Sequence, residues 1–195
     1  MFHTKLGQII TGANSKRQPE LATFSEKVMG QVFHMPLSSR LQMSDIKDRL
    51  SLSFNTFWAD VEVPAPPADR MALQFTINGK GSPPEAAQLT LQLVLKEGEL
   101  LETGAGRRFT VGLDRIDLAP ADIGGWIRHR GWTMKPGPAA SLKWPVYPHN
   151  PYADAPEKSL AYAVAALSVP LELKQVPGKY VRPKEQQITV SLEAQ

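Results

Sequence analysis

The sequence contains no cysteine. This absence excludes a disulfide framework, a thiolate metal site and a cysteine nucleophile. Long apolar runs are also missing: the longest, from Ala161 to Leu171, is far shorter than the roughly 20 residues that a membrane helix requires. The N-terminal residues lack the apolar core of a secretion signal. We therefore expect a soluble chain without membrane association and, by default, a cytoplasmic location.

Catalytic and nucleotide-binding signatures are missing as well. The segment Gly104-Ala105-Gly106 lacks both the third glycine of a dinucleotide fingerprint and the Gly-Lys-Ser/Thr ending of a P-loop. No serine lies in a Gly-x-Ser-x-Gly elbow, and no two histidines have a metal-binding spacing such as His-x-x-x-His. The sequence thus predicts no cofactor and no metal site, and it leaves enzymatic activity undecided.

The composition that is present is typical of a globular protein. Hydrophobic residues make up 42% of the 195 residues and charged residues 21%, close to the average for folded domains. The 17 prolines exceed the usual share of about 5%, and they cluster between segments of regular apolar spacing. Many rigid connections between short segments favour an all-β architecture. The expected organisation is one domain with an appended arm.

Residues 1–49 are predicted to form an arm with one or two short helices. Pro19 is a good first helical residue, and apolar residues recur after it at helical spacing, which predicts a helix from Pro19 to Phe33. Ser44 can cap a second helix that ends near Leu50. Because the first helix has an apolar face, that face must be buried against the chain or a partner. The arm is therefore a candidate interface for a protein partner or a homo-oligomer.

After Leu50 the apolar spacing changes to two residues, the period of a strand with one buried face. The predicted strands are Leu50–Val63 with a bulge or bend, Met71–Ile77, Leu89–Leu95, Phe109–Leu113 and Ile188–Leu192. The loop of residues 78–88 is expected to join its neighbouring strands as an antiparallel pair. Residues 156–168 have two interpretations: a capping box at Asp154 favours a helix, whereas alternation from Ala161 to Leu173 favours a strand. We prefer the strand.

About seven short strands, separated by proline and glycine turns and without a strand-helix-strand rhythm, predict an antiparallel, jelly-roll-like β-sandwich over residues 50–195. Its predicted core contains Leu52, Phe54, Leu73, Phe75, Leu91, Leu93, Val111, Leu171 and Val190. This fold class and the aromatic content are typical of accessory β-sandwich domains in polysaccharide-processing proteins, which is an analogy of fold and no family assignment.

The stretch from Ile123 to Ala153 is the most distinctive part of the sequence. It contains three of the four tryptophans and four cations but no carboxylate, in a chain whose net charge is only +3. Indole and phenol rings can stack on the C–H faces of sugars, and arginine can bind a carboxylate or sulfate through two parallel hydrogen bonds. We predict a binding site for a polar or anionic glycan. Its candidate residues are Trp126, Arg128, His129, Arg130, Trp132, Trp144, Tyr147, His149 and Tyr152.

Other interpretations of this stretch stay open. A structural crossover would bury all of its tryptophans, whereas a binding site needs at least two rings exposed along a groove or platform. An enzyme or enzyme fragment acting on polysaccharide would use His129 or His149 with a carboxylate within about 3 Å or through one water. The flanking carboxylates are Asp114, Asp117, Asp122 and Asp154. Protein binding is a minor alternative. Nucleic-acid binding is disfavoured because no recognised module accompanies the isoelectric point of about 9.2.

Overall fold

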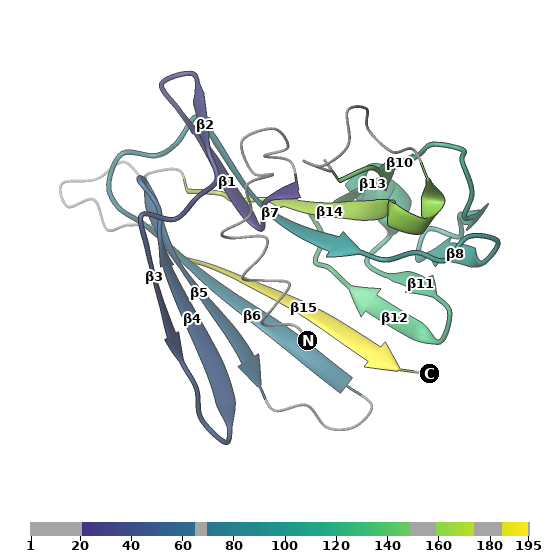
Figure 1. Ribbon diagram of the computed structural model, residues 1–195, viewed down its shortest axis with the longest axis horizontal. Helices are drawn as coiled ribbons and strands as arrows, with labels where there is room; N and C mark the ends of the chain where they lie inside the picture. The colour runs from purple at the N-terminus through teal and green to yellow at the C-terminus, as the bar shows by residue number, and fades with distance from the viewer. Residues whose placement is uncertain (1–20, 65–69, 149–158, 174–184, 195) are drawn as a thin grey trace.

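The computed structural model describes residues 21–64, 70–148, 159–173 and 185–194. These residues are mainly β and form two antiparallel sheets that pack against each other (Figure 1). The six-stranded sheet contains, in spatial order, β10 (Ile116–Leu118), β13 (Ser141–Val146), β14 (Val164–Pro170), β7 (Ala86–Leu93), β1 (Phe24–Val28) and β2 (Gln31–Phe33). The nine-stranded sheet contains β3 (Ser38–Gln42), β4 (Lys47–Ser53), β5 (Phe57–Pro64), β6 (Arg70–Gly79), β15 (Glu185–Ala194), β12 (Trp132–Lys135), β11 (Ile127–His129), β8 (Leu100–Thr103) and β9 (Arg108–Thr110). Short helical turns, α2 (Pro120–Ile123) and η3 (Leu160–Tyr162), lie between strands.

Alternation of apolar and polar side chains places one face of each sheet in a common core. Val61 of β5 lies opposite Phe75 of β6. Ala59 lies opposite Ile77, and all four side chains are buried. Burial of such apolar surface supplies most of the favourable free energy of folding. The predicted core is confirmed, because eight of its nine members are buried and Leu91 is partly buried against them.

Four phenylalanine rings join the two sheets at the centre of this core. Phe24 comes from β1, and its ring centroid lies 5.7 Å from that of Phe54 and 6.0 Å from that of Phe57. Phe75 lies 6.2 Å from Phe24, while Phe54 and Phe57 stack on each other at 4.6 Å. Aromatic pairs at these distances contribute about 0.5–1.5 kcal/mol beyond their buried area. The ring cluster therefore fixes β1 over the β4–β5 hairpin.

A buried carboxylate reinforces the same junction. Glu26 of β1 is only 1% exposed, and it accepts hydrogen bonds from two residues in the turn between β4 and β5. Asn55 donates from its backbone N and from Nδ2, both at 2.8 Å. Thr56 donates from its backbone N at 3.0 Å and from Oγ1. Four donors thus stabilise a charge that has no cationic partner among the described residues, as a buried carboxylate requires.

The predicted helix from Pro19 to Phe33 is wrong from Phe24 onward, where the chain forms β1 and β2. Met29 and Gly30 make the turn between these strands, with positive φ of 50° and 77°. A two-residue turn of this kind connects antiparallel strands and breaks a helix. Packing of Phe24 against the other phenylalanines outweighs the helical spacing of the apolar residues. Residues 1–20 lie outside the described part of the chain.

The second predicted helix, from Ser44 to Leu50, is also wrong. The Ser44 hydroxyl accepts a hydrogen bond from Lys47 N at 3.1 Å and donates one to Lys47 O at 2.6 Å. This local cap closes the β3–β4 turn instead of starting a helix. The predicted boundary at Leu50 falls inside β4, and the strands on both sides of it belong to the same two sheets. A division of the chain into an arm and a domain stays a prediction.

Several strands lie where the alternation predicted them, although their connections differ. β6, β7 and β15 match the predictions, and β14 confirms a strand for residues 164–168. The single strand with a bulge or bend that was predicted from Leu50 to Val63 is wrong: Phe54 N donates to Phe57 O at 2.9 Å, and the chain reverses into a hairpin. The pairing predicted across the loop of residues 78–88 is wrong too. β6 pairs with β5 and β15, whereas β7 pairs with β1 and β14 in the other sheet.

Removing the Glu26 carboxylate should loosen the packing of the two sheets. We expect Glu26→Ala to lower the free energy of unfolding by about 3 kcal/mol, because it leaves buried donors without an acceptor. Glu26→Gln should also destabilise the chain, since an amide nitrogen cannot accept these bonds. Urea unfolding measures both, with the exposed Glu97→Ala as a control that should change little. A Glu26→Gln variant as stable as the original chain would contradict this role of the carboxylate.

A pH dependence is expected from His34, between β2 and β3. Both ring nitrogens are buried without a hydrogen-bond partner in the described ranges, and burial holds the pKa of His34 below its usual value of 6.5. As the pH falls below that value, the unfolded chain takes up a proton that the folded chain does not, so the free energy of unfolding decreases. His34→Gln should reduce this decrease between about pH 7.5 and pH 5.5 in urea unfolding. An identical pH profile for the variant would rule out this contribution.

Candidate functional site

The β11–β12 hairpin presents three of the predicted site residues together. His129 ends β11 and Trp132 begins β12, directly opposite each other. The residues between them, Arg130 and Gly131, both have positive φ, of 42° and 70°, as in a type I′ turn. Glycine adopts this conformation freely, whereas an arginine does so at a small energetic cost. The tight turn places the Arg130 side chain beside the two rings.

An open pocket of about 410 Å³ lies beside this turn. It is lined by Val94, Lys96, Glu99, His129, Arg130 and Trp132. The first three belong to the connection between β7 and β8, where the chain crosses from the six-stranded to the nine-stranded sheet. The other three belong to the β11–β12 hairpin. The pocket therefore lies between the β7–β8 connection and the β11–β12 hairpin of the nine-stranded sheet.

His129 is a fixed part of the pocket wall. Its side chain is buried, and Nε2 accepts a hydrogen bond from Lys96 N at 2.9 Å. Because Nε2 is an acceptor, Nδ1 carries the proton and donates it to Leu100 O at 2.9 Å. The two backbone groups thus hold the imidazole as its neutral Nδ1–H tautomer. Neither nitrogen is available to remove a proton from a substrate.

Two cations and one carboxylate surround the mouth of the pocket. Glu99 Oε1 lies 3.8 Å from Lys96 Nζ and 3.7 Å from Arg130 Nε, distances too long for hydrogen bonds. All three side chains are about half exposed. Ion pairs that are loose and exposed add little to stability, so the cations can turn toward a ligand at low cost. The three side chains together carry one excess positive charge.

Trp132 supplies the aromatic surface of the pocket. Its indole is half-buried, and the ring of His129 meets it edge to face, with centroids 5.7 Å apart and an interplanar angle of 67°. Because the imidazole is anchored at both nitrogens, it restricts the orientation of the indole. The pocket therefore combines one fixed ring with cations that can move.

Trp126 and Arg128 lie on the opposite face of the same sheet. Side chains alternate along β11, so Arg128 points away from the face that carries Ile127 and His129. The guanidinium of Arg128 lies 5.0 Å from the centre of the Trp126 ring, and its Nη1 lies 3.8 Å from Glu102 Oε2. The structure thus divides the predicted residues between two faces instead of gathering them in one groove.

The remaining predicted residues lie elsewhere. Trp144 of β13 is 1% exposed and donates from Nε1 to Gly112 O at 2.9 Å, so it fills the core and offers no surface to a ligand. Tyr147 is half-buried and packs against the core. His149 and Tyr152 fall outside the described residues.

No hydrogen bond or ion pair joins a histidine to a carboxylate in the described part of the chain. Arg115 pairs with Asp117 at 2.8 Å, and Asp122 lies 3.1 Å from a guanidinium nitrogen of Arg107. Asp114 is exposed, and Asp154 falls outside the described ranges. Within those ranges, no group of three or more histidines, aspartates and glutamates is arranged to hold a metal ion. None of the helices described there has the length and apolar character to span a membrane.

Sequence reasoning missed the half of the pocket that residues 94–99 supply. Lys96 and Glu99 begin and end the charged segment Lys-Glu-Gly-Glu, which is typical of any exposed turn. The local signal is Val94, an exposed apolar residue between two buried leucines, where alternation predicts a polar one. Its proximity to Trp132 depends on the crossover between sheets, which no local pattern indicates.

Comparisons with known proteins give little guidance. No family model and no curated protein matches the chain. Among solved structures, it is similar to a mutant of the heparan sulfate lyase HepC from Pedobacter heparinus, with 9% sequence identity and a TM-score of 0.42. The similarity covers 93% of this chain and 26% of that chain. The chain therefore spans about a quarter of the length of the lyase, and a similarity this weak establishes no shared function.

The state of His129 can be tested directly. Nitrogen NMR of the imidazole should show a protonated Nδ1 and an unprotonated, hydrogen-bonded Nε2 at neutral pH. His129→Phe should lower the free energy of unfolding by about 2 kcal/mol, because Lys96 N and Leu100 O lose their partner. Trp132→Phe retains both bonds and should cost less. A doubly protonated His129, or one protonated at Nε2, would contradict the described hydrogen bonds.

Proposed function

We propose that the chain is a noncatalytic, carbohydrate-binding β-sandwich domain that binds its ligand in the pocket around Trp132. The observation that carries this proposal is the convergence of one fixed indole and two cations on a pocket of about 410 Å³. Pockets of about 300–1,000 Å³ suit small ligands, so this one suits one or two sugar units of a longer glycan. The site is smaller than the predicted stretch and includes residues from outside it.

The chemistry of the pocket favours a glycan with an acidic group. The indole of Trp132 offers an apolar face to the C–H groups of a sugar ring. Arg130 can bind a carboxylate or sulfate through two parallel hydrogen bonds, while Lys96 adds a second positive charge. Glu99 can accept hydrogen bonds from sugar hydroxyls once the cations turn to the anionic group. A neutral apolar compound would use only the indole.

The hydrogen bonds of His129 and the ion pairs of the aspartates agree with binding without catalysis. Both nitrogens of His129 are bonded to the backbone, and the carboxylates of Asp117 and Asp122 face arginines. The alternative, an enzyme acting on polysaccharide, would depend on His149 with Asp154, which lie outside the described residues. Nucleic-acid binding has weaker support, because several cations on the sheet faces have their own carboxylates.

A second function, protein binding, is favoured by a different surface. Of thirteen large apolar side chains that are exposed in the described ranges, eight lie between residues 29 and 46. They are Met29, Val32, Phe33, Met35, Leu37, Leu41, Met43 and Ile46. A concentration of exposed apolar residues in one segment makes that segment a candidate for protein binding. These residues belong to the segment that the sequence predicted as an interface, although they lie in β2, in β3 and in the turns beside these strands instead of in helices.

Glycan binding should depend on Trp132 and Arg130 in different ways. On an array of neutral, uronate-containing and sulfated glycans, Trp132→Ala should weaken binding to every bound glycan by about tenfold or more. Arg130→Asn keeps a sequence that favours a type I′ turn, and it should weaken only acidic glycans, by about tenfold.

Lys143→Ala is the matched control, because Lys143 is an exposed cation on the other sheet. It should leave binding unchanged, and circular dichroism should show that all three variants fold. The carbohydrate proposal fails if no glycan binds, or if folded Trp132→Ala binds as well as the original chain.

A further inference from the structure

β3 is the end strand of the nine-stranded sheet. β3 pairs with β4 on one side, and no strand pairs with its other side in the described part of the chain (Figure 1). All five of its residues are exposed. Proteins usually protect such an edge with proline, inward-pointing charges or a covering segment, because its free N–H and C=O groups can pair with another strand. β3 contains no proline.

Exposed apolar side chains lie on β3 and at both of its ends. Leu41 lies opposite Leu50, which lies opposite the buried Val61, so Leu41 is on the face that carries the core. By alternation Ser39 shares that face, while Leu37 and Met43 come directly before and after β3 in the chain. The exposed fractions are 67% for Leu37, 47% for Leu41 and 71% for Met43. A strand added to β3 could cover Leu41 with a side chain on the same face.

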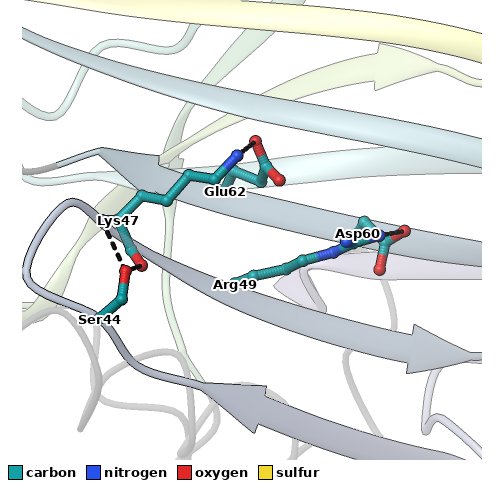
Figure 2. Close-up of polar contacts among 5 residues, drawn as sticks. All are labelled: Ser44, Lys47, Arg49, Asp60 and Glu62. Carbon is teal, nitrogen blue, oxygen red and sulfur yellow. Dashed lines mark hydrogen bonds and ion pairs between the residues drawn. The ribbon is translucent and has the colours of Figure 1, made fainter.

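The other face of the edge carries a cation, Arg40, for which the described residues supply no ion-pair partner. Figure 2 shows that the neighbouring cations have partners: Lys47 Nζ lies 2.8 Å from Glu62 Oε2, and Arg49 Nη2 lies 2.7 Å from Asp60 Oδ2. Partial burial raises the pKa of Asp60, but hydrogen bonds from Arg49 and Ser51 and the charge of Arg49 outweigh it and lower that pKa. Asp60 therefore stays ionised and committed to Arg49.

Arg40 of β3 lies opposite Ser51 and has no ion-pair partner within the described residues. A partner strand that carries a carboxylate at the position facing Arg40 would therefore supply the missing charge. Two copies of β3 paired in full overlap would instead place Arg40 opposite Arg40, and like charges directly opposite each other are destabilising. The charge pattern favours an acidic partner over a second copy of the chain.

We propose that β3 binds an extended segment of another protein by β-strand addition, with an apolar side chain over Leu41 and an acidic side chain facing Arg40. The inference rests on the protein-binding function proposed above and specifies its partner. Hydrogen bonds between the main chains provide affinity, and the alternating side chains provide selectivity. The segment recognised is therefore acidic and apolar at alternate positions.

Two synthetic peptides of about ten residues test this inference, one alternating valine with glutamate and one alternating valine with lysine. Fluorescence anisotropy should show that the chain binds the glutamate peptide about fivefold more tightly than the lysine peptide. Arg40→Glu should reverse this preference, whereas Lys143→Glu, a charge reversal on the other sheet, should retain it. Hydrogen exchange should show that the bound peptide protects the amides of residues 37–43.

Four outcomes would overturn the inference. The first is no binding of the glutamate peptide, and the second is equal binding of both peptides. The third is protection only outside residues 37–43, which leaves a protein-binding function in place but removes β3 as its site. The fourth combines two observations on the chain without peptide: protection of β3 amides increases with protein concentration, and light scattering gives the mass of a dimer. That result would make a second copy the occupant.

Discussion

The buried carboxylate of Glu26 and the ring of Phe24 fix the relation between the two sheets. Both belong to β1, and both contact the hairpin of β4 and β5 in the other sheet. A buried charge must keep its hydrogen bonds, because losing them costs far more than a typical surface contact. β1 can therefore dock on the hairpin in only one position. Hydrogen-bonded pairing then sets the positions of the other strands, outward from β1 in one sheet and from the hairpin in the other.

This constraint also determines where functional surfaces can form. The segment of residues 34–37 leads from β2, at the edge of one sheet, to β3, at the edge of the other. The segment of residues 94–99 makes another crossover and supplies half of the pocket. Crossovers bring side chains from distant parts of the sequence together, and these side chains do not alternate regularly between buried and exposed. The proposed glycan pocket and the proposed docking edge both lie next to such crossovers, while the sheet faces carry paired charges.

Alternation predicted the buried faces well because it reports directly on which side of a strand is buried. It therefore identified the core, including Phe75 and Val190, without any knowledge of pairing. Alternation did not predict the N-terminal strands, because the spacing of Phe24 and Val28 fits a helix and a strand equally well. The turn at Met29 and Gly30 decides in favour of strands. Alternation also failed to assign strands to sheets, because the pairing of β7 with β1 joins residues that are far apart in sequence.

The candidate site was predicted less well than the core. Arg130 and Trp132 lie in the pocket, since a two-residue turn keeps neighbours in sequence close in space. Trp144 fits the composition of a binding site equally well, but its indole donates to Gly112 inside the core. Composition cannot distinguish a buried tryptophan from an accessible one, because both use the same apolar ring. Lys96 and Glu99 join the site only through the tertiary fold.

The most direct test of the central claim uses the four tryptophan indoles as reporters in one NMR titration. A uronate-containing oligosaccharide is added to the labelled chain, and the indole N–H resonances are followed after assignment by single substitutions. We expect the Trp132 resonance to shift strongly and saturably, while those of Trp58, Trp126 and Trp144 change little. Shifts confined to Trp126 or Trp58 would place the ligand on the opposite face of the sheet and contradict the pocket. An absence of shifts at all four indoles would contradict binding of this glycan class.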